Sequence, residues 1–204
     1  MSTIKKKTQQ GLLVILSAPS GCGKTTIVDR LLKRHEDRIR AVSVTTRKPR
    51  LGEKDGVDYF FVTREAFKKM EKAGELLESA KVFDEYYGTP KSFVREQLKS
   101  GKTVILAIDV QGAKILRTKA ALKGPQFSIF VLPPSVKVLR DRLEGRRTDS
   151  PEEIEKRLQI AQEEIKEAGS YDRTVMNQNL DQTVLEIERL MDEFLKKKSA
   201  VHAA

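Results

Sequence analysis

One segment near the amino terminus has the composition of a phosphate-binding loop: it reads APSGCGKT over residues 18–25. Small residues let consecutive backbone N–H groups wrap around an anion. Lys24 would place a positive charge on the β- and γ-phosphates of a nucleotide, and the Thr25 hydroxyl suits Mg²⁺. The candidate phosphate-binding residues are Ala18, Pro19, Ser20, Gly21, Cys22, Gly23, Lys24, Thr25 and Thr26.

Two positions in this loop leave alternatives open. Such loops usually begin with glycine, but residue 18 is alanine, which fits where the backbone adopts an ordinary conformation. Cys22 is the only thiol of the chain. It is either a small filler or a reactive cysteine whose pKa is lowered by the helix N-terminus and by Lys24.

A parallel sheet must position the loop. The apolar run at 11–17 is typical of a strand buried on both faces, and residues 24–34 carry apolar side chains at helical spacing. Further strands are predicted at 39–44, 104–109, 127–132 and 174–176, and helices at about 64–73, after Ser135, after Ser150 and at 180–194. This alternation predicts an α/β fold with helices on both faces of the sheet.

Acidic and basic side chains follow these strands. Asp109 ends the predicted strand 104–109, where a carboxylate can hold the water shell of Mg²⁺. Between residues 43 and 90, short alternating stretches among glycines predict a small mixed β lobe inserted into the core. Arg47 and Arg50 in this lobe offer two guanidinium groups for a phosphate with several open oxygens; the alternative is a solvated basic turn.

Composition restricts the class of protein. The chain has 204 residues and a formal net charge of +10, and 39% of its residues are hydrophobic, which excludes wholesale disorder. One cysteine and two distant histidines exclude a disulfide scaffold and a Cys/His zinc site. No apolar run reaches the ~18 residues that a membrane span needs. The lysine runs at 5–7 and 196–198 are interpreted as solvated tails, so we expect a cytoplasmic protein with no nucleic-acid or membrane partner.

Five segments in a fixed order make the assignment specific. After the phosphate loop come TTRKPRLGEKDGVDYFFV, ELLESAKVFDEYYGT, IDVQG and RLEGRRTDSPEEIEKRL. With these segments in register from Gly11 to about Leu195, the chain resembles guanylate kinases. The resemblance implies a P-loop kinase fold with a GMP-binding lobe and a helical lid. It also implies transfer of the γ-phosphate of ATP to GMP, which gives GDP and ADP and supplies GTP and dGTP.

The resemblance also implies roles for individual residues. The GMP phosphate is matched by Arg47, Arg50, Tyr59 and Tyr87, and the guanine by Ser43, Glu78 and Thr89, with Asp109 near the base and the metal. One carboxylate, Glu78, can accept both adjacent donors of guanine, N1–H and N2–H₂. Adenine has an unprotonated N1 at that place, and unpaired buried polar groups are how sites reject analogues.

The arginine-rich lid of the family is matched by Arg142, Arg146 and Arg157, with Lys24 as the other catalytic residue. Asn177 matches a position near the adenine of ATP. Mg²⁺ is the implied cofactor, held by Thr25 and, through water, by Asp109. Where the family tends to have an acidic residue, this chain has Ala107, so one outer contact to the metal region is missing.

The expected organisation is a polar tail (1–10) and one domain (11–198), whose core is 11–42, 91–139 and 158–198, with the GMP-binding lobe at 43–90 and the lid at 140–157. The expected partners are ATP and GMP, with dGMP as an open alternative, and the chain is a monomer or a homodimer. Two other functions compete: a kinase for another phosphorylated sugar or nucleotide, and a non-catalytic module that holds a phosphopeptide. Ser43, Glu78 and Thr89 favour GMP over the first. Lys24, Thr25 and Asp109 argue against the second, because a binding module does not need ATP.

Overall fold

The computed structural model describes residues 11–82, 84–118, 122, 124–145 and 150–201. Five strands form a sheet in the order β2 (Arg38–Arg40), β7 (Thr103–Ala107), β1 (Leu13–Ser17), β8 (Gln126–Leu132) and β9 (Arg173–Met176). All neighbouring strands in this sheet are parallel. The predicted α/β fold around a parallel sheet is therefore confirmed.

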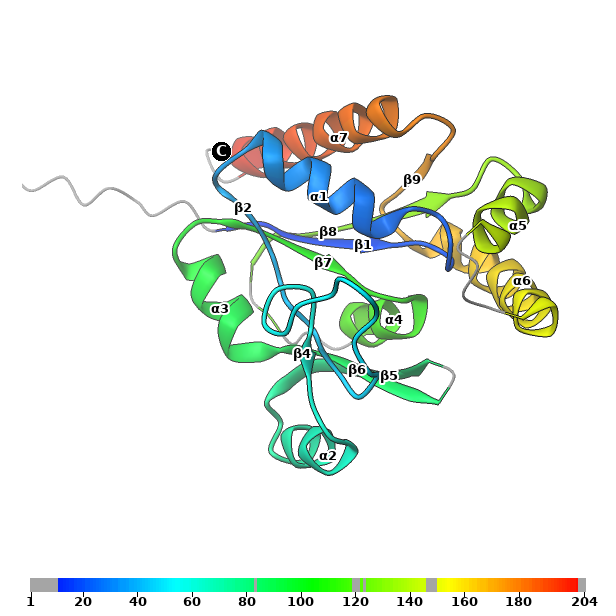
Figure 1. Cartoon of the computed structure of the whole chain (residues 1–204). Helices are drawn as coiled ribbons and strands as arrows, with labels where there is room; N and C mark the ends of the chain where they lie inside the picture. The colour runs from blue at the N-terminus through cyan, green and yellow to red at the C-terminus, as the bar shows by residue number, and fades with distance from the viewer. Residues whose placement is uncertain (1–10, 83, 119–121, 123, 146–149, 202–204) are drawn as a thin grey trace, which may run out of the picture.

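Helices cover both faces of this sheet (Figure 1). On one face lie α1 (Lys24–Arg34) and α7 (Leu180–Val201), and on the other lie α3 (Lys91–Lys99) and α4 (Val110–Thr118). Alternate residues of β1 serve the two faces: Val14 and Leu16 belong to the core under α1 and α7, and Leu13 and Ile15 to the core under α3 and α4. A central strand buried on both sides requires the continuous apolar run seen in the sequence.

A second, four-stranded sheet forms the inserted lobe. Its strands are β4 (Phe60–Phe61), β3 (Val44–Thr45), β6 (Glu85–Pro90) and β5 (Leu76–Val82), in that order. The β3–β4 pair is parallel, whereas β3–β6 and β5–β6 are antiparallel, so the sheet is mixed as expected. Helix α2 (Arg64–Lys72) lies beside β5 on the side away from the core (Figure 1).

The prediction of one strand at 39–44 was wrong. This segment holds two strands, because β2 pairs with β7 in the first sheet and β3 pairs with β4 and β6 in the second. Residues 41–43 between them carry the chain from the core into the lobe. An apolar pattern indicates that a segment is buried but not which strand it pairs with. The pattern of residues 39–44 therefore does not show that the chain passes from one sheet to the other.

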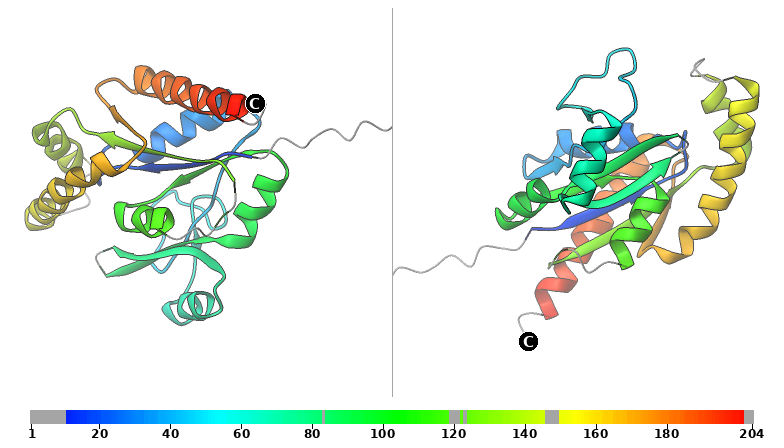
Figure 2. Two further views of the ribbon diagram at one scale, coloured as in Figure 1. Left: turned by 180° about the vertical axis from the view of Figure 1, so that it is seen from behind. Right: turned by 90° about the horizontal axis from the view of Figure 1, so that it is seen from below.

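Two further helices, α5 (Val136–Glu144) and α6 (Pro151–Lys166), stand at one end of the molecule, and a short 3₁₀ turn (Glu167–Ser170) leads from α6 to β9. Helix α6 begins with the predicted capping box, in which the Ser150 hydroxyl accepts from Glu153 N and the Glu153 carboxylate accepts from Ser150 N. In both views of Figure 2 the β5–β6 hairpin points toward α6. Among the helices formed by the described residues, none is long and apolar enough to cross a membrane.

Candidate active site

A cavity of about 540 Å³ opens at the carboxyl ends of β1 and β7, between the second sheet and α6. Most of the residues that the sequence singled out line it: every loop residue from 18 to 26 except Cys22, together with Ser43, Arg47, Arg50, Tyr59, Glu78, Tyr87, Asp109 and Arg157. These residues come from segments more than 130 positions apart in the chain. The fold therefore gathers most of the predicted site around one hollow.

The phosphate loop has the backbone geometry that anion binding needs. Gly21 and Gly23 have positive φ angles of 92° and 82°, which side chains on L-residues disfavour. Gly23 precedes α1 and has no side chain to cap the helix, and the first turn of α1 contains no acidic residue. The positive end of the helix is therefore directed at the cavity, where an anion would be stabilised.

The ammonium of Lys24 is held across the mouth of this loop. Its Nζ atom donates to the carbonyl oxygen of Ile108 at 3.0 Å and to that of Ala18 at 3.4 Å. Burial lowers the pKa of Lys24, whereas the carboxylates of Asp109 and Glu164 oppose that shift. An incoming polyphosphate would give this cation a stronger partner than two neutral carbonyls.

Cys22 faces the protein interior. Its side chain has an exposed fraction of 0% and belongs to the core that also includes Ile27, Leu139 and Leu143. The structure contradicts an accessible, reactive thiol and supports the interpretation of Cys22 as a small filler. The sequence could not separate the two, because both depend on which side of the loop the thiol lies.

Asp109, which was predicted to end its strand, lies two residues beyond it, since β7 ends at Ala107. Its Oδ1 atom accepts from the backbone N–H groups of Gln111 at 2.7 Å and Gly112 at 3.0 Å, as an N-cap of α4 does. These two hydrogen bonds fix the carboxylate at the wall of the cavity. The end of the strand was misplaced by two residues, but the position of Asp109 at the sheet edge was as expected.

Glu78 is a buried carboxylate, with an exposed fraction of 3%. The β5–β6 pairing shifts register between Leu76 and Ser79, and such a bulge changes the direction of side chains in the strand. The Thr89 hydroxyl donates to Glu78 Oε1 at 2.6 Å. The pKa of Glu78 is raised to about 7, mainly by burial and in part by the charge of Asp109, while the hydrogen bonds from Thr89 oppose the shift. Thr89 itself is fully buried behind Glu78.

The basic segment of the lobe is held in shape by Glu53. One carboxylate oxygen of Glu53 pairs with Arg47 Nη2 at 2.9 Å, and the other accepts from Arg50 N at 2.7 Å. Burial alone would raise the pKa of Glu53, but the hydrogen bonds from Arg47 and Arg50 lower it below its usual value. The Arg47 guanidinium lies over the Tyr59 ring at 5.4 Å, and that ring meets Tyr87 edge-on at 6.0 Å.

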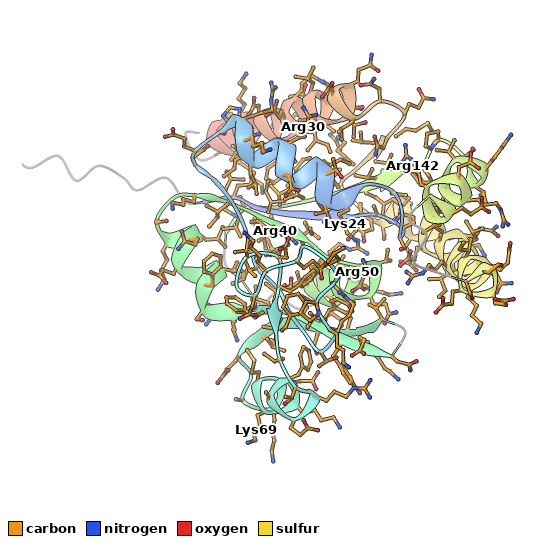
Figure 3. The ribbon with its side chains drawn as sticks, viewed as in Figure 1. Lys24, Arg30, Arg40, Arg50, Lys69 and Arg142 are labelled. Carbon is orange, nitrogen blue, oxygen red and sulfur yellow. The ribbon has the colours of Figure 1, made fainter. Side chains whose placement is uncertain are left out.

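This packing gives the lobe a fixed edge of cationic and phenolic groups toward the cavity. In Figure 3, Arg50 in the lobe lies below Lys24, which stands at the start of α1, and both residues line the cavity. Burial raises the pKa of Tyr59, so its hydroxyl stays protonated and can donate a hydrogen bond to an anion. Two sets of anion-binding groups therefore face one another.

Helix α6 closes a third side of the cavity. Arg157 Nη1 donates to the Ser20 hydroxyl of the phosphate loop at 3.2 Å. Glu164 lies two turns further along the same face, and burial raises its pKa to about 7 with a smaller opposing effect of Lys24. Glu164 was not predicted from the sequence, although the spacing of cavity residues 153, 157, 160 and 164 is that of one helix face.

Besides Cys22 and Thr89, which are buried and do not line the cavity, three predicted residues stand apart from the cavity or from the description. Arg142 is not among the lining residues; its Nη2 donates to Asn177 O at 3.2 Å, and its buried Nη1 has no hydrogen-bond partner among the described residues. Asn177 is buried as well, and its amide points at the back of the phosphate loop. Arg146 lies outside the described residues.

Comparison with known proteins agrees with this arrangement. Residues 10–194 match the family model described as guanylate kinase. A guanylate kinase of Wolbachia sp. subsp. Brugia malayi (strain TRS) is 47% identical over 196 residues, covering 94% of this chain and 97% of that protein. One of Clostridioides difficile (strain 630) is 44% identical over 191 residues, covering 94% and 92%.

A solved structure extends the comparison to three dimensions. The crystal structure of guanylate kinase from Anaplasma phagocytophilum superimposes with a TM-score of 0.75 at 33% identity, covering 91% of this chain and 86% of that one. The matches in sequence and structure span both the core and the inserted lobe. With its phosphate loop, lobe and cavity arranged in this way, the chain belongs to the guanylate kinase family.

Proposed function

We propose that this chain transfers the γ-phosphate of ATP to GMP, giving ADP and GDP. The observation that carries the proposal is the meeting, in one cavity, of a phosphate loop with a buried carboxylate suited to guanine. Residues 43–90 serve as the GMP-binding lobe, 140–157 as the lid, and the remaining described residues as the core. The phosphates of ATP bind at the phosphate loop, and GMP binds to the lobe.

Phosphoryl transfer needs no covalent intermediate with the protein, which contributes the position of the reactants and the charges around them. An oxygen of the GMP phosphate attacks the γ-phosphorus of ATP in line, and charge spreads over the transferred group. Lys24 neutralises it from the phosphate loop, Arg157 from α6, and Arg47 and Arg50 from the lobe. Closure of α6 over the loop would exclude water, which otherwise hydrolyses ATP.

The residues at the loop fit a Mg²⁺ ion. The Thr25 hydroxyl lines the cavity, and the carboxylate of Asp109, fixed through Oδ1, lines it too; both are the hard oxygen donors that Mg²⁺ prefers. Among the described residues, no three His, Cys, Asp or Glu side chains are grouped to hold a metal, which agrees with an ion bound mainly by phosphates. Bound Mg²⁺ would neutralise charge on the β- and γ-phosphates.

Selection of guanine follows from the surroundings of Glu78. The Thr89 hydroxyl fixes one carboxylate oxygen, so the pair of oxygens has a set orientation for the N1–H and N2–H₂ donors. A buried carboxylate left without donors costs free energy, and a base without N1–H leaves it so. Ser43 lies on the same cavity wall and would contact the base.

A coupled assay of ADP production tests the proposal. GMP, AMP, UMP and ribose 5-phosphate are each offered with Mg·ATP. We expect turnover with GMP at least a hundredfold above the others. Turnover with a sugar phosphate or another nucleotide instead would support a different kinase on the same fold. No turnover with any of them would support a binding module.

Binding of GMP should depend on pH through Glu78. Its pKa of about 7 in the ligand-free protein means that the carboxyl must lose a proton before it can accept both guanine donors. The affinity should be constant above pH 7 and fall toward tenfold per pH unit below it. Calorimetric titration between pH 6 and 8 measures this. The GMP phosphate has its own pKa near about 6, which overlaps this range, so the profile is compared with that of Glu78→Gln. In Glu78→Gln the part due to the carboxyl should be lost and only the dependence due to the phosphate should remain; the same profile in both proteins would contradict the assignment.

Gly112→Ala should weaken GMP binding specifically. A Cβ atom at residue 112 would lie 2.7 Å from Glu78 Oε2, so the carboxylate must move from its place. Overpacking costs about 1–3 kcal/mol, which corresponds to a rise of about five- to 150-fold in KM for GMP. Gly169→Ala is the matched control, since no atom lies within 4 Å of a Cβ there. An unchanged KM for GMP would show that Glu78 does not need its present position.

Arg50→Lys should raise KM for GMP by about tenfold, because an ammonium cannot bind two phosphate oxygens as a guanidinium does. Binding of Mg·ATP alone should be unaffected. Arg95→Lys, at an exposed position on α3, is the control. Equal weakening of both nucleotides would mean that Arg50 supports the fold and not the GMP phosphate.

A further inference from the structure

Asn177 lies behind the phosphate loop, directly after β9. Its backbone N–H donates to Leu132 O at 2.8 Å and so continues the pairing of β9 with β8 by one residue. Its exposed fraction is 5%, and it does not line the cavity. A polar side chain buried at this place needs partners within the protein.

The amide of Asn177 has a partner on each side. Nδ2 donates to the carbonyl oxygen of Cys22 at 2.8 Å, and Oδ1 accepts from the Thr183 hydroxyl at 3.2 Å. A carbonyl only accepts, so the Cys22 contact requires the nitrogen on that side and leaves the oxygen for Thr183. The Thr183 hydroxyl has one hydrogen, which it shares between Asn177 Oδ1 and the nearer Asn179 O, at 2.7 Å, at the start of α7. The amide is therefore held in one orientation.

The contact with Cys22 determines where the next N–H group points. In a trans peptide the C=O and the N–H lie on opposite sides of the chain. With the Cys22 oxygen held from behind by Asn177, the N–H of Gly23 is directed to the other side, where Gly23 lines the cavity. The approach is close: a Cβ atom at Gly23 would lie 3.2 Å from Asn177 Nδ2.

We propose that Asn177 is a positioning residue, which holds the Cys22–Gly23 peptide so that the Gly23 N–H faces the phosphates of ATP, with Thr183 fixing the amide. Arg142 donates to the backbone oxygen of the same residue at 3.2 Å, so Asn177 also joins the loop to α5. This inference rests on the proposed function, because it concerns the phosphates of ATP. It differs from a contact with adenine, which would act on the base alone.

Three variants and three ligands test it. Asn177→Ala removes the amide, Thr183→Val removes the hydroxyl with little change of shape, and Asn179→Ala is the control. Asn179 has the same side chain two residues away, but its amide oxygen accepts from Gln182 N at the start of α7. Calorimetry measures the affinity of each protein for Mg·ATP, for Mg·tripolyphosphate, which lacks a base, and for GMP.

For Asn177→Ala we expect affinity for Mg·ATP and for Mg·tripolyphosphate to fall by the same factor of about ten, equal to about 1.4 kcal/mol. GMP affinity should be unchanged, and in the steady state KM for ATP should rise while KM for GMP does not. Thr183→Val should lower both polyphosphate affinities by about threefold, and Asn179→Ala should leave them unchanged.

Other results would overturn the inference. A loss confined to Mg·ATP would indicate a contact with adenine. A loss shared with GMP, together with a lower melting temperature, would indicate a general structural role. Unchanged affinity in Asn177→Ala would also contradict it and leave the proposed function intact, whereas failure of the unchanged protein to bind Mg·ATP would contradict the proposed function first.

Discussion

Replacement of Glu78 by glutamine is expected to abolish most activity on GMP. The amide has one acceptor where the carboxylate has two, and its NH₂ group would oppose one of the guanine donors. Hydrogen bonds to charged groups contribute about 1.5–3 kcal/mol each, and the glutamine offers neither guanine donor a charged acceptor, so kcat/KM for GMP should fall by about 10²- to 10⁴-fold. Steady-state kinetics with GMP varied at saturating Mg·ATP measures this loss.

The variant should remain folded, because the amide oxygen can still accept from the Thr89 hydroxyl and no buried carboxylate has to ionise. Affinity for Mg·ATP should not change. Glu75→Gln is the matched control, since Glu75 is exposed and lies just before β5. Unchanged kcat/KM for GMP in Glu78→Gln would contradict the guanine assignment.

Lys24→Met should lower kcat by about 10³-fold, the size of effect found when a preorganised group that stabilises transition-state charge is removed. Methionine keeps the length of the side chain and loses the cation that is held between the carbonyls of Ala18 and Ile108. Single-turnover transfer from labelled ATP to GMP measures the chemical step directly.

The binding of GMP should survive in Lys24→Met, because the lobe residues are untouched. The melting temperature should not fall, since burial of the ammonium is itself unfavourable, as its lowered pKa indicates. Lys33→Met, in the last turn of the same helix, is the control. A kcat within threefold of the unchanged protein would show that Lys24 does not face the transferred phosphate.

The phosphate loop could be predicted from the sequence because its chemistry is local. Eight consecutive residues supply the glycines, the cation and the hydroxyl, and the flanking apolar run and helix supply their context. The orientation of each side chain within the loop was not predictable. Whether Cys22 faces the phosphates or the core depends on α5, which supplies Leu139 and Leu143 to the same core.

In the lobe, the direction of the Glu78 side chain could not be predicted from the sequence. The resemblance pointed to the residue, but its direction is set by the irregular β5–β6 pairing and by the space that Gly112 leaves. A strand pattern of period two does not reveal a bulge, because one extra residue reverses the alternation that the pattern assumes.

Contacts between distant segments could not be predicted either: Glu164 was not identified, and Asn177 was expected near adenine but not in contact with the loop. Glu164 and Asn177 meet the phosphate loop from α6 and from the end of β9, roughly 140 and 155 positions after it. Only the packing of the sheet and helices brings them there. Both act on residues that the sequence did identify, Lys24 and Cys22.

A crystal structure with bound GMP tests the central claim most directly. The account predicts that N1 and N2 of guanine lie within hydrogen-bonding distance of the two carboxylate oxygens of Glu78. The phosphate should lie among Arg47, Arg50 and the hydroxyls of Tyr59 and Tyr87, facing Lys24 across the cavity. A guanine ring directed to solvent would contradict it. So would a phosphate bound beside Glu78, at the position predicted for the base.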